Sequence, residues 1–444
     1  MEQGPAGRDV AVVIGAGIGG LAAARVLAPR YRRVLVLDRD ELPDCPAPRR
    51  GVPQGNHGHV LLVAGQQALE RLFPGLDAEL VAAGATPFDP GTGLRLHRYG
   101  RVYPPLATDL RLVSMSRPLL ETRLRRRVLG LPTVALRTGT AVAGLTGTGT
   151  AVTGVTTGDG EAIRADLVVD CSGRGSRSDR WLAALGYPAP AALEVRVGVG
   201  YATRLLHRDP GDLPGAVGVF VLPTPPDEKR VGLVVPVEDD RWLVSLGGWH
   251  GAHAGPGDDG FRAHAAALPE PSIAALLARA RPAGQIVTIT FPASRWRRFD
   301  RLARPAAGYL ALGDAVGSFN PVYGQGMTCA AMQAEELGRV LDRYPRAGVA
   351  MSRAFHRAVA RVIATPWRFA VGGDFAFAET TGARPPAIGL LNRYGRAVQR
   401  ASQSDPVVRR AFTGVQQLVR PPAALFSPAV VARVVRGARR ADRA

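Results

Sequence analysis

A glycine-rich turn between an apolar strand and a helix constrains the fold of this chain more than any other feature. Residues 10–38 run as an apolar strand, the sequence Gly-Ala-Gly-Ile-Gly-Gly, a helix, and a second apolar strand that ends in Asp38. In such a unit Gly15 permits the tight turn, Gly17 lets the backbone approach a pyrophosphate, and Gly20 allows close helix–strand packing. The helix N-terminus suits phosphate, and a carboxylate at Asp38 suits a ribose hydroxyl. We therefore predict an α/β protein with a Rossmann-like dinucleotide-binding domain.

A second strand–turn–helix segment indicates which dinucleotide, FAD or NAD, the chain binds. Residues 309–312 are typical of a short buried strand, Gly313-Asp314 ends it, and a Gly/Pro loop then opens a helix near Met327. An extended polyol such as the ribityl chain of FAD needs a carboxylate along its length, and an anionic reduced flavin needs positive potential at its N1 and C2=O end. Asp314 and the N-terminus of the Met327 helix meet these two needs, so the sequence favours FAD over NAD.

The nucleotide-binding domain is expected to be discontinuous, because strands of a different pattern lie between its pieces. Alternating apolar and polar residues recur in 94–103 and from about 195 to 290, which is typical of antiparallel strands in an inserted substrate domain. Helical spacing with proline breaks follows Pro345. We expect FAD-binding segments at 8–90, 116–190 and 291–345, mostly antiparallel substrate-domain strands at 91–115 and 191–290, and a C-terminal helical region at 346–444.

The net charge is strongly positive, with 56 Lys and Arg residues against 37 Asp and Glu residues, or +19. Lys229 is the single lysine, and the arginines are scattered among aliphatic residues. Grooves that bind single-stranded nucleic acid instead have basic residues interleaved with aromatic ones. We therefore expect no nucleic-acid partner. The alternative from another class is a basic binding protein with an incidental glycine motif, which would be colourless and would bind DNA in a salt-dependent way.

Cysteine and histidine usage predicts neither a disulfide framework nor a metal site. Cys45, Cys171 and Cys329 lie far apart without a CxxC pair, and His57 and His59 lack a further ligand cluster. The first nine residues do not have the pattern of a secretory signal, and no run predicts a transmembrane segment. A cytoplasmic location is expected.

Three motifs, taken in order, resemble those of the FAD-dependent aromatic-hydroxylase-type (class A) flavoprotein monooxygenases. They are the glycine turn, the segment Asp170-Cys-Ser-Gly-Arg-Gly-Ser176, and the Gly313-Asp314 segment. Within that class, residues 50–61, 116–121 and 319–324 are similar to the polyene epoxidases of polyether antibiotic biosynthesis. Two departures are that the usual Asp-Gly doublet is spread into Asp170-Cys-Ser-Gly, and that Gly317 stands where a histidine is common.

The resemblance implies a set of cofactor-binding residues. Those near the adenosine and pyrophosphate would be Gly15, Ala16, Gly17, Gly20, Asp38, Arg39, Arg50, Arg117, Val142 and Asp170, and those near the ribityl chain and isoalloxazine would be Asp314, Pro321, Gly324, Gly326 and Met327. No protein base is required for attack by an alkene, and the candidates for a catalytic contribution are Gln54, His57 and Tyr323.

The function implied is oxygen insertion into an apolar olefinic natural-product intermediate. Enzymes of this class reduce FAD with NAD(P)H, form a flavin C4a-hydroperoxide with O2, and shield it from water. Epoxidation is the expected reaction, with aromatic hydroxylation and a flavin-linked desaturase or reductase as alternatives. Electrons are expected to come from NAD(P)H, either directly or through a separate reductase. A further hypothesis is that an acidic carrier protein delivers the substrate. Flavin halogenases rely on a lysine and a Trp-x-Trp-x-Ile-Pro stretch, and Lys229 lies in a different context.

Overall fold

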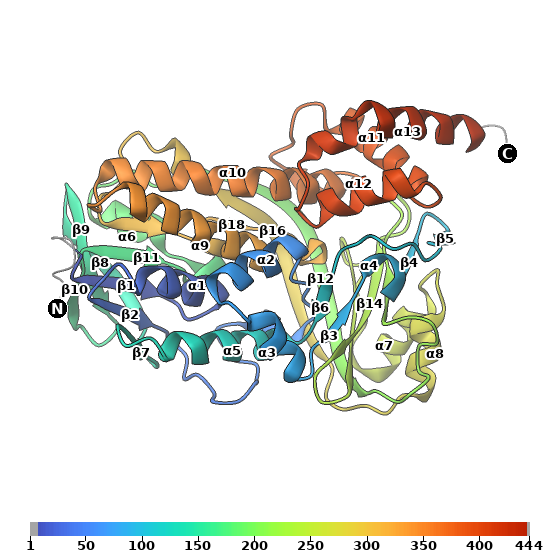
Figure 1. Cartoon of the computed structure of the whole chain (residues 1–444), viewed down its shortest axis with the longest axis horizontal. Coiled ribbons are helices and arrows are strands. Elements are labelled where there is room, and N and C mark those ends of the chain that lie inside the picture. Colours follow the sequence, from blue (N-terminus) through green and yellow to red (C-terminus); the bar gives the residue numbers. More distant parts are fainter. Residues whose placement is uncertain (1–7, 442–444) are drawn as a thin grey trace.

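A parallel sheet forms one side of the molecule in the computed structural model, which describes residues 8–441 (Figure 1). Its strands lie in the order β17 (Tyr309–Ala311), β11 (Leu167–Asp170), β1 (Val10–Ile14), β2 (Arg33–Leu37) and β7 (Val134–Arg137). The apolar strand β1 is central, because it pairs with both β11 and β2. Residues 1–7, where no secretory signal is predicted, and 442–444 lie outside the described range.

Helices drawn from distant parts of the chain cover this sheet. The helix α1 (Ile18–Leu27) leads from β1 to β2 and packs against α9 (Gly326–Arg343), which in turn contacts α2 (Val63–Leu72) and α10 (Val349–Asp374). On its buried face α1 presents alanine and leucine side chains that are almost completely inaccessible. The helix α5 (Arg117–Leu129) is capped at its N-terminus by Ser116, whose hydroxyl accepts a hydrogen bond from Leu119 N at 3.1 Å. The predicted βαβ unit is confirmed.

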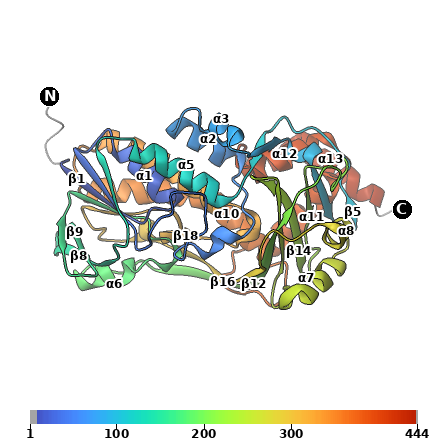
Figure 2. The same ribbon diagram turned by 90° about the horizontal axis from the view of Figure 1, so that it is seen from below.

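A second, mostly antiparallel sheet forms the other side of the molecule (Figure 2). Its strand order is β18 (Gly317–Ser318), β16 (Val287–Arg297), β12 (Ala192–His207), β15 (Arg241–Gly248), β14 (Arg230–Val237), β13 (Gly218–Val221), β4 (Leu94–Arg98) and β5 (Arg101–Val102), with β19 (Thr381–Gly382) beside β12. The pairing of β13 with β4 is parallel. The long strands β12 and β16 run between the two sides of the molecule in Figure 2.

Smaller elements complete the two sides. The helices α7 (Gly257–Ala266) and α8 (Ser272–Arg279) pack on the antiparallel sheet around Phe261 and Ile273. The other strands are β3 (Thr86–Phe88), β6 (Leu112–Ser114), β8 (Val142–Thr148), β9 (Ala151–Thr157) and β10 (Ala162–Arg164), and the other helices before α9 are α3 (Leu76–Ala82), α4 (Pro90–Gly93) and α6 (Ser178–Ala184).

The C-terminal region is helical and lies over the end of the antiparallel sheet that carries β4 and β5 (Figure 1). It contains α11 (Ile388–Ala401), α12 (Pro406–Gln416) and α13 (Pro428–Ala441), which share a small core that includes Val398, Val408 and Val434. The expected proline breaks hold at the starts of α12 and α13, but Pro366 lies inside α10, which continues to Asp374.

The structure differs from the expected segment boundaries where strands cross them. The strand β16 continues past residue 290 to Arg297, because Arg295 and Trp296 pair with β18. The sheet assigned to the substrate domain therefore extends into the segment expected to bind FAD. The hairpin of β4 and β5 joins the same sheet, as does β12, the longest strand.

Candidate cofactor and substrate site

A single large cavity connects the glycine turn with the C-terminal helices. Its volume is about 1290 Å³. Pockets for one small ligand usually measure roughly 300–1,000 Å³, so this cavity has room for a dinucleotide and a second molecule. One end is lined by the turn after β1 and by Asp38, and the other by α10, α11 and α12. We call these the glycine-turn half and the apolar half.

The glycine turn owes its shape to close backbone approaches. Gly15 has φ +99°, and a Cβ atom on it would lie 2.7 Å from the carbonyl oxygen of Cys171. A Cβ atom on Gly20 would overlap the carbonyl oxygen of Gly15. Gly17 differs, since the nearest atoms to its Cβ position are Arg49 Nη2 at 3.7 Å and Arg117 Nη2 at 3.9 Å. Gly15 and Gly20 are therefore required by the fold, whereas Gly17 keeps space open in front of two guanidinium groups.

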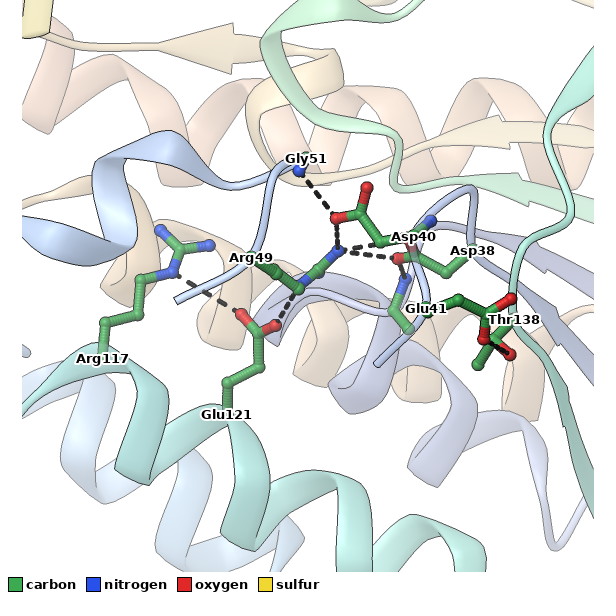
Figure 3. Close-up of polar contacts among 9 residues, drawn as sticks. Asp38, Asp40, Glu41, Arg49, Gly51, Arg117, Glu121 and Thr138 are labelled. Carbon is green, nitrogen blue, oxygen red and sulfur yellow. Dashed lines mark hydrogen bonds and ion pairs between the residues drawn. The ribbon is translucent and has the colours of Figure 1, made fainter. Parts of the chain in front are cut away.

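Arg49 joins three carboxylates at this end of the cavity (Figure 3). Its Nη1 lies 3.1 Å from Asp38 Oδ1 and 2.9 Å from Asp40 Oδ2, and its Nε lies 2.6 Å from Glu121 Oε1. Arg117 reaches the other oxygen of Glu121 at 3.6 Å. Although burial lowers the pKa of Arg49, Glu121 and Asp38 raise it overall, so the guanidinium stays charged.

These residues fit the pyrophosphate of a dinucleotide. Two guanidinium groups face the space that a Gly17 side chain would fill, beside the N-terminus of α1, where the first turn lacks acidic residues. Guanidinium groups and free helix N–H groups are both donors to phosphate oxygens. The site therefore has the donor set and the open volume that FAD or NAD requires.

Asp314 marks the boundary between the two halves. It follows β17 and lies beside the N-terminus of α9, where a Cβ atom on Gly326 would be 3.5 Å from Asp314 Oδ1. Among the described residues, no hydrogen bond reaches its carboxylate, which lines the cavity. Burial raises the pKa of Asp314, and the charges of Arg117 and Arg174 act against this rise. A ribityl hydroxyl would supply the missing partner.

Most of the predicted site residues line this cavity. The predicted cofactor residues that do so are Gly15, Gly17, Asp38, Arg39, Arg117, Val142, Asp314, Pro321, Gly324, Gly326 and Met327. The catalytic candidates Gln54, His57 and Tyr323 line it as well. The topology thus brings together residues from both ends of the sequence, while their roles stay a prediction.

Four predicted cofactor residues lie elsewhere. Ala16 is fully buried and its N–H donates to Asp38 Oδ2 at 2.7 Å, and Gly20 is enclosed by the turn itself. Arg50 is exposed and does not line the cavity, because its neighbour Arg49 occupies that position. These three residues therefore do not line the cavity.

Asp170 is the fourth of these residues, and its position has a clear physical reason. The carboxylate is fully buried and accepts hydrogen bonds from Ser172 Oγ at 2.5 Å, Ser176 Oγ at 2.6 Å and Tyr309 OH at 3.0 Å. With both oxygens occupied, Asp170 holds the loop at 171–176, from which Gly173 and Arg174 line the cavity.

His57 lines the cavity, and its ring is almost completely buried. Its Nδ1 lies 2.7 Å from Thr203 Oγ1, which is itself 2.5 Å from Ser245 Oγ, whereas its buried Nε2 has no partner among the described residues. Burial lowers the pKa of His57 to about 4. The imidazole is therefore neutral near pH 7. The Nδ1–H of His59 donates a hydrogen bond to His57 O at 2.9 Å, which fits a role in holding this loop.

Asp374, which the sequence did not indicate, lies directly behind the loop at 320–324. Its Oδ1 accepts hydrogen bonds from Trp249 Nε1 at 2.9 Å, Asn320 Nδ2 at 2.8 Å and Tyr323 OH at 3.3 Å, and its buried Oδ2 has no partner among the described residues. Burial raises the pKa of Asp374 to about 7, against the effect of these hydrogen bonds. The end of α10 thus fastens the loop that borders both halves of the cavity.

The wall of the apolar half consists of aliphatic and aromatic side chains from two sources. The sheet contributes Leu96, Phe220, Leu222, Leu233 and Val235, and the C-terminal helices contribute Phe369, Ile388, Val398, Phe412 and Leu425. Such a wall excludes water and suits an apolar ligand. Lys229 does not line the cavity and instead contacts Glu379.

Neither a metal-binding cluster nor a membrane-spanning helix occurs within residues 8–441. No group of three or more His, Cys, Asp and Glu side chains is placed to hold a metal ion. No helix in this range is long and apolar enough to cross a bilayer.

Comparisons with known proteins agree with this architecture. Residues 13–51 match the family of NAD(P)-binding Rossmann-like domains. Protein Rv3254 of Mycobacterium tuberculosis is 37% identical over 437 residues, which cover 91% of this chain and 88% of that protein. A flavoprotein/dehydrogenase structure from Cytophaga hutchinsonii has a TM-score of 0.68 at 18% identity and covers 94% of each chain. The structure of PqsL, a probable FAD-dependent monooxygenase from Pseudomonas aeruginosa, has a TM-score of 0.58 at 20% identity, covering 92% of this chain and 98% of that one.

Proposed function

The chain belongs to the same family as Protein Rv3254 and has the fold of FAD-dependent monooxygenases, and from this premise we propose that it is an FAD-dependent monooxygenase that epoxidises an alkene. The substrate of this proposal is an apolar olefinic natural-product intermediate, into which one oxygen atom of O2 is inserted. The observation that carries the proposal is the continuous cavity, whose glycine-turn half suits a dinucleotide and whose apolar half suits the substrate.

The chain's own residues would hold FAD in three places. Arg49 and Arg117 face the open space at Gly17 and would bind the pyrophosphate. Asp314 would accept hydrogen bonds from the ribityl chain, and the N-terminus of α9 would supply positive potential to the isoalloxazine. Bound FAD would supply the activation of O2 after reduction by NAD(P)H, received directly or through a separate reductase.

The remaining residues of the cavity would position the alkene and exclude water. Apolar side chains from the sheet and the C-terminal helices would exclude water from the space next to the loop at 320–324. Asp374 holds this loop through hydrogen bonds from Asn320 and Tyr323. An alkene needs no deprotonation, so no base is required for this reaction.

Aromatic hydroxylation on the same fold is the second candidate, and a flavin-linked desaturase or reductase is the third. Hydroxylation of a phenol gains from a base that removes the phenolic proton. His57 lines the cavity, but its Nδ1 is held by Thr203 and burial lowers its pKa to about 4, so it is a poor acceptor for this proton and hydroxylation is the less favoured reaction. A desaturase or reductase would turn over without consuming O2.

Product analysis with isotopically labelled oxygen tests the proposal. The purified protein, with NAD(P)H and a flavin reductase supplied, is incubated with candidate polyenes and candidate phenols under 18O2. Epoxidation predicts mass spectra with a single labelled oxygen added to each reacting alkene. A labelled hydroxyl on the phenol alone would replace the proposal by the second candidate, and unlabelled product with no O2 consumed would replace it by the third.

A further inference from the structure

Arg98 lies in the apolar half of the cavity and has no acidic partner within residues 8–441. It ends β4 and lines the cavity. Its Nη1 donates to the side-chain oxygen of Gln399 on α11, and its guanidinium lies 5.1 Å from the ring centroid of Tyr99. Its Nε is buried and has no hydrogen-bond partner among the described residues. A guanidinium that is partly withdrawn from water and unpaired is costly, and a bound anion would offset this cost.

The distribution of charge along the cavity wall supports an anionic ligand at this end. Asp38 and Asp314 are the carboxylates among the described lining residues, and neither belongs to the apolar half. Arg368 and Arg396 line the apolar half at exposed positions. Arg409 also lines it, but its guanidinium is occupied by the carbonyl oxygens of Ser402, Pro104 and Gln403.

Arg98 lies close to the loop that borders the proposed flavin site. Burial and then Asp374 raise the pKa of Tyr323, and the positive charge of Arg98 acts in the opposite direction. The carbonyl oxygen of Arg98 accepts a hydrogen bond from Gln403 Nε2 at 2.8 Å, and Tyr103 OH donates to Gln399 O at 3.1 Å. The hydrogen bond to Gln399 thus orients the guanidinium, and the bond from Gln403 fixes the backbone of Arg98, so the side chain is partly preorganised for a ligand.

We propose that Arg98 binds a carboxylate of the substrate, so that the substrate is an amphipathic acid with an apolar chain. This inference rests on the proposed function and narrows its substrate class. A carboxylate of the ligand would accept hydrogen bonds from the terminal Nη N–H groups of Arg98 that protein atoms leave unused, while the chain lies along the aliphatic and aromatic wall. A thioester on a carrier protein has no such charge, so the free acid is the form that the site selects.

Calorimetric titration of the flavin-loaded protein with laurate and with dodecanol tests the proposal. The two probes share the alkyl chain and differ in the charged head group. We expect laurate to bind more tightly than dodecanol. We expect Arg98→Gln to lower the affinity for laurate by roughly ten-fold or more, and to change the affinity for dodecanol by less than about two-fold. Arg98→Lys, which keeps the charge, should retain most of the laurate affinity.

Gln399→Ala is the matched control, because it removes the contact between β4 and α11 but leaves the guanidinium. It should weaken laurate binding by much less than Arg98→Gln does, because the cation remains although one of its hydrogen bonds is lost. The proposal is overturned if laurate and dodecanol bind equally, if neither binds, or if Arg98→Gln weakens both probes alike, since equal losses indicate a purely structural role.

The flavin content of each sample separates this inference from the proposed function. A protein that holds FAD but shows no preference for laurate contradicts the role of Arg98 and leaves the monooxygenase proposal intact. A protein that cannot hold FAD but binds laurate through Arg98 contradicts the monooxygenase proposal and supports the anion site.

Discussion

Arg49 Nε donates to Glu121 Oε1 at 2.6 Å and thereby links the loop after β2 to helix α5. The same guanidinium contacts Asp38 and Asp40, so three carboxylates converge on one cation (Figure 3). The exposed fractions of the four side chains lie between 5% and 10%, so water screens these charges little. This cluster shapes the end of the cavity where a pyrophosphate is expected.

Arg49→Met should destabilise the protein strongly, because it leaves three nearly buried carboxylates without their shared cation. Breaking a buried ion pair from one side costs about 3–5 kcal/mol. The free energy of unfolding, measured with urea at fixed flavin concentration, should fall by about this amount. Arg50→Met is the matched control, since Arg50 is exposed and its loss should change stability by less than about 0.5 kcal/mol. Equal effects of the two substitutions would contradict the assignment.

Gly17→Val should abolish FAD binding without unfolding the protein. The nearest atoms to a Cβ on Gly17 are Arg49 Nη2 at 3.7 Å and Arg117 Nη2 at 3.9 Å, so the backbone accepts a Cβ there, and the two methyl groups would extend into the space that we assign to the pyrophosphate. We expect FAD affinity to fall by roughly 100-fold or more, with an unchanged circular dichroism spectrum. Gly20→Ala should behave in the opposite way and lose folded structure, because its Cβ would overlap Gly15 O. Full FAD occupancy in Gly17→Val would exclude the phosphate-cradle role.

Asp314→Ala should weaken FAD binding by roughly ten-fold or more, because it removes the carboxylate that we assign to the ribityl chain. Asp314→Asn, which keeps one acceptor oxygen, should lose less. Asp342→Ala removes the same charge at an exposed ion pair with Arg30 and should leave FAD affinity unchanged. Flavin fluorescence titration measures all three. Unchanged affinity in Asp314→Ala would remove Asp314 from the flavin site.

The sequence predicts the parts of the site whose residues are close together along the chain. Gly15 to Asp38 form one local unit, so the residue types and their spacing are enough to predict a dinucleotide-binding turn. Arg49 was missed in favour of Arg50 because both lie in a loop, where no periodicity tells which side chain points inward. Its role depends on Glu121, 72 residues away.

Longer-range contacts were still less predictable. Arg98 meets Gln399 across 301 residues, and Asp374 meets Asn320 from the end of a helix in the C-terminal region. Asp170 was assigned to the cofactor from its place at a strand end, yet Ser172, Ser176 and Tyr309 occupy its oxygens. Strand ends can be located from the sequence, but the partners that saturate a carboxylate there depend on tertiary packing.

Asp374 should make stability depend on pH. Burial raises its pKa to about 7 in the folded protein, compared with 3.8 for an unperturbed carboxyl group. The folded state therefore holds the proton more tightly, so the stability from this group is complete below about pH 4 and is lost as the pH rises through about 7.

Asp374→Asn removes this titration while keeping an oxygen for Trp249, Asn320 and Tyr323. Between about pH 4 and pH 8, the free energy of unfolding of the unmodified protein should fall by roughly 4 kcal/mol relative to the variant. Urea unfolding of both proteins across this range measures the difference. A constant difference would show that Asp374 does not titrate in this window.

The most direct test of the account is the identity and amount of flavin released by heat from the purified protein after saturation with FAD and removal of the excess. The cavity between the glycine turn and the C-terminal helices predicts one FAD per chain, and predicts its loss in Gly17→Val. A colourless protein that retains no FAD, or one whose FAD content is the same in Gly17→Val, would contradict the central claim.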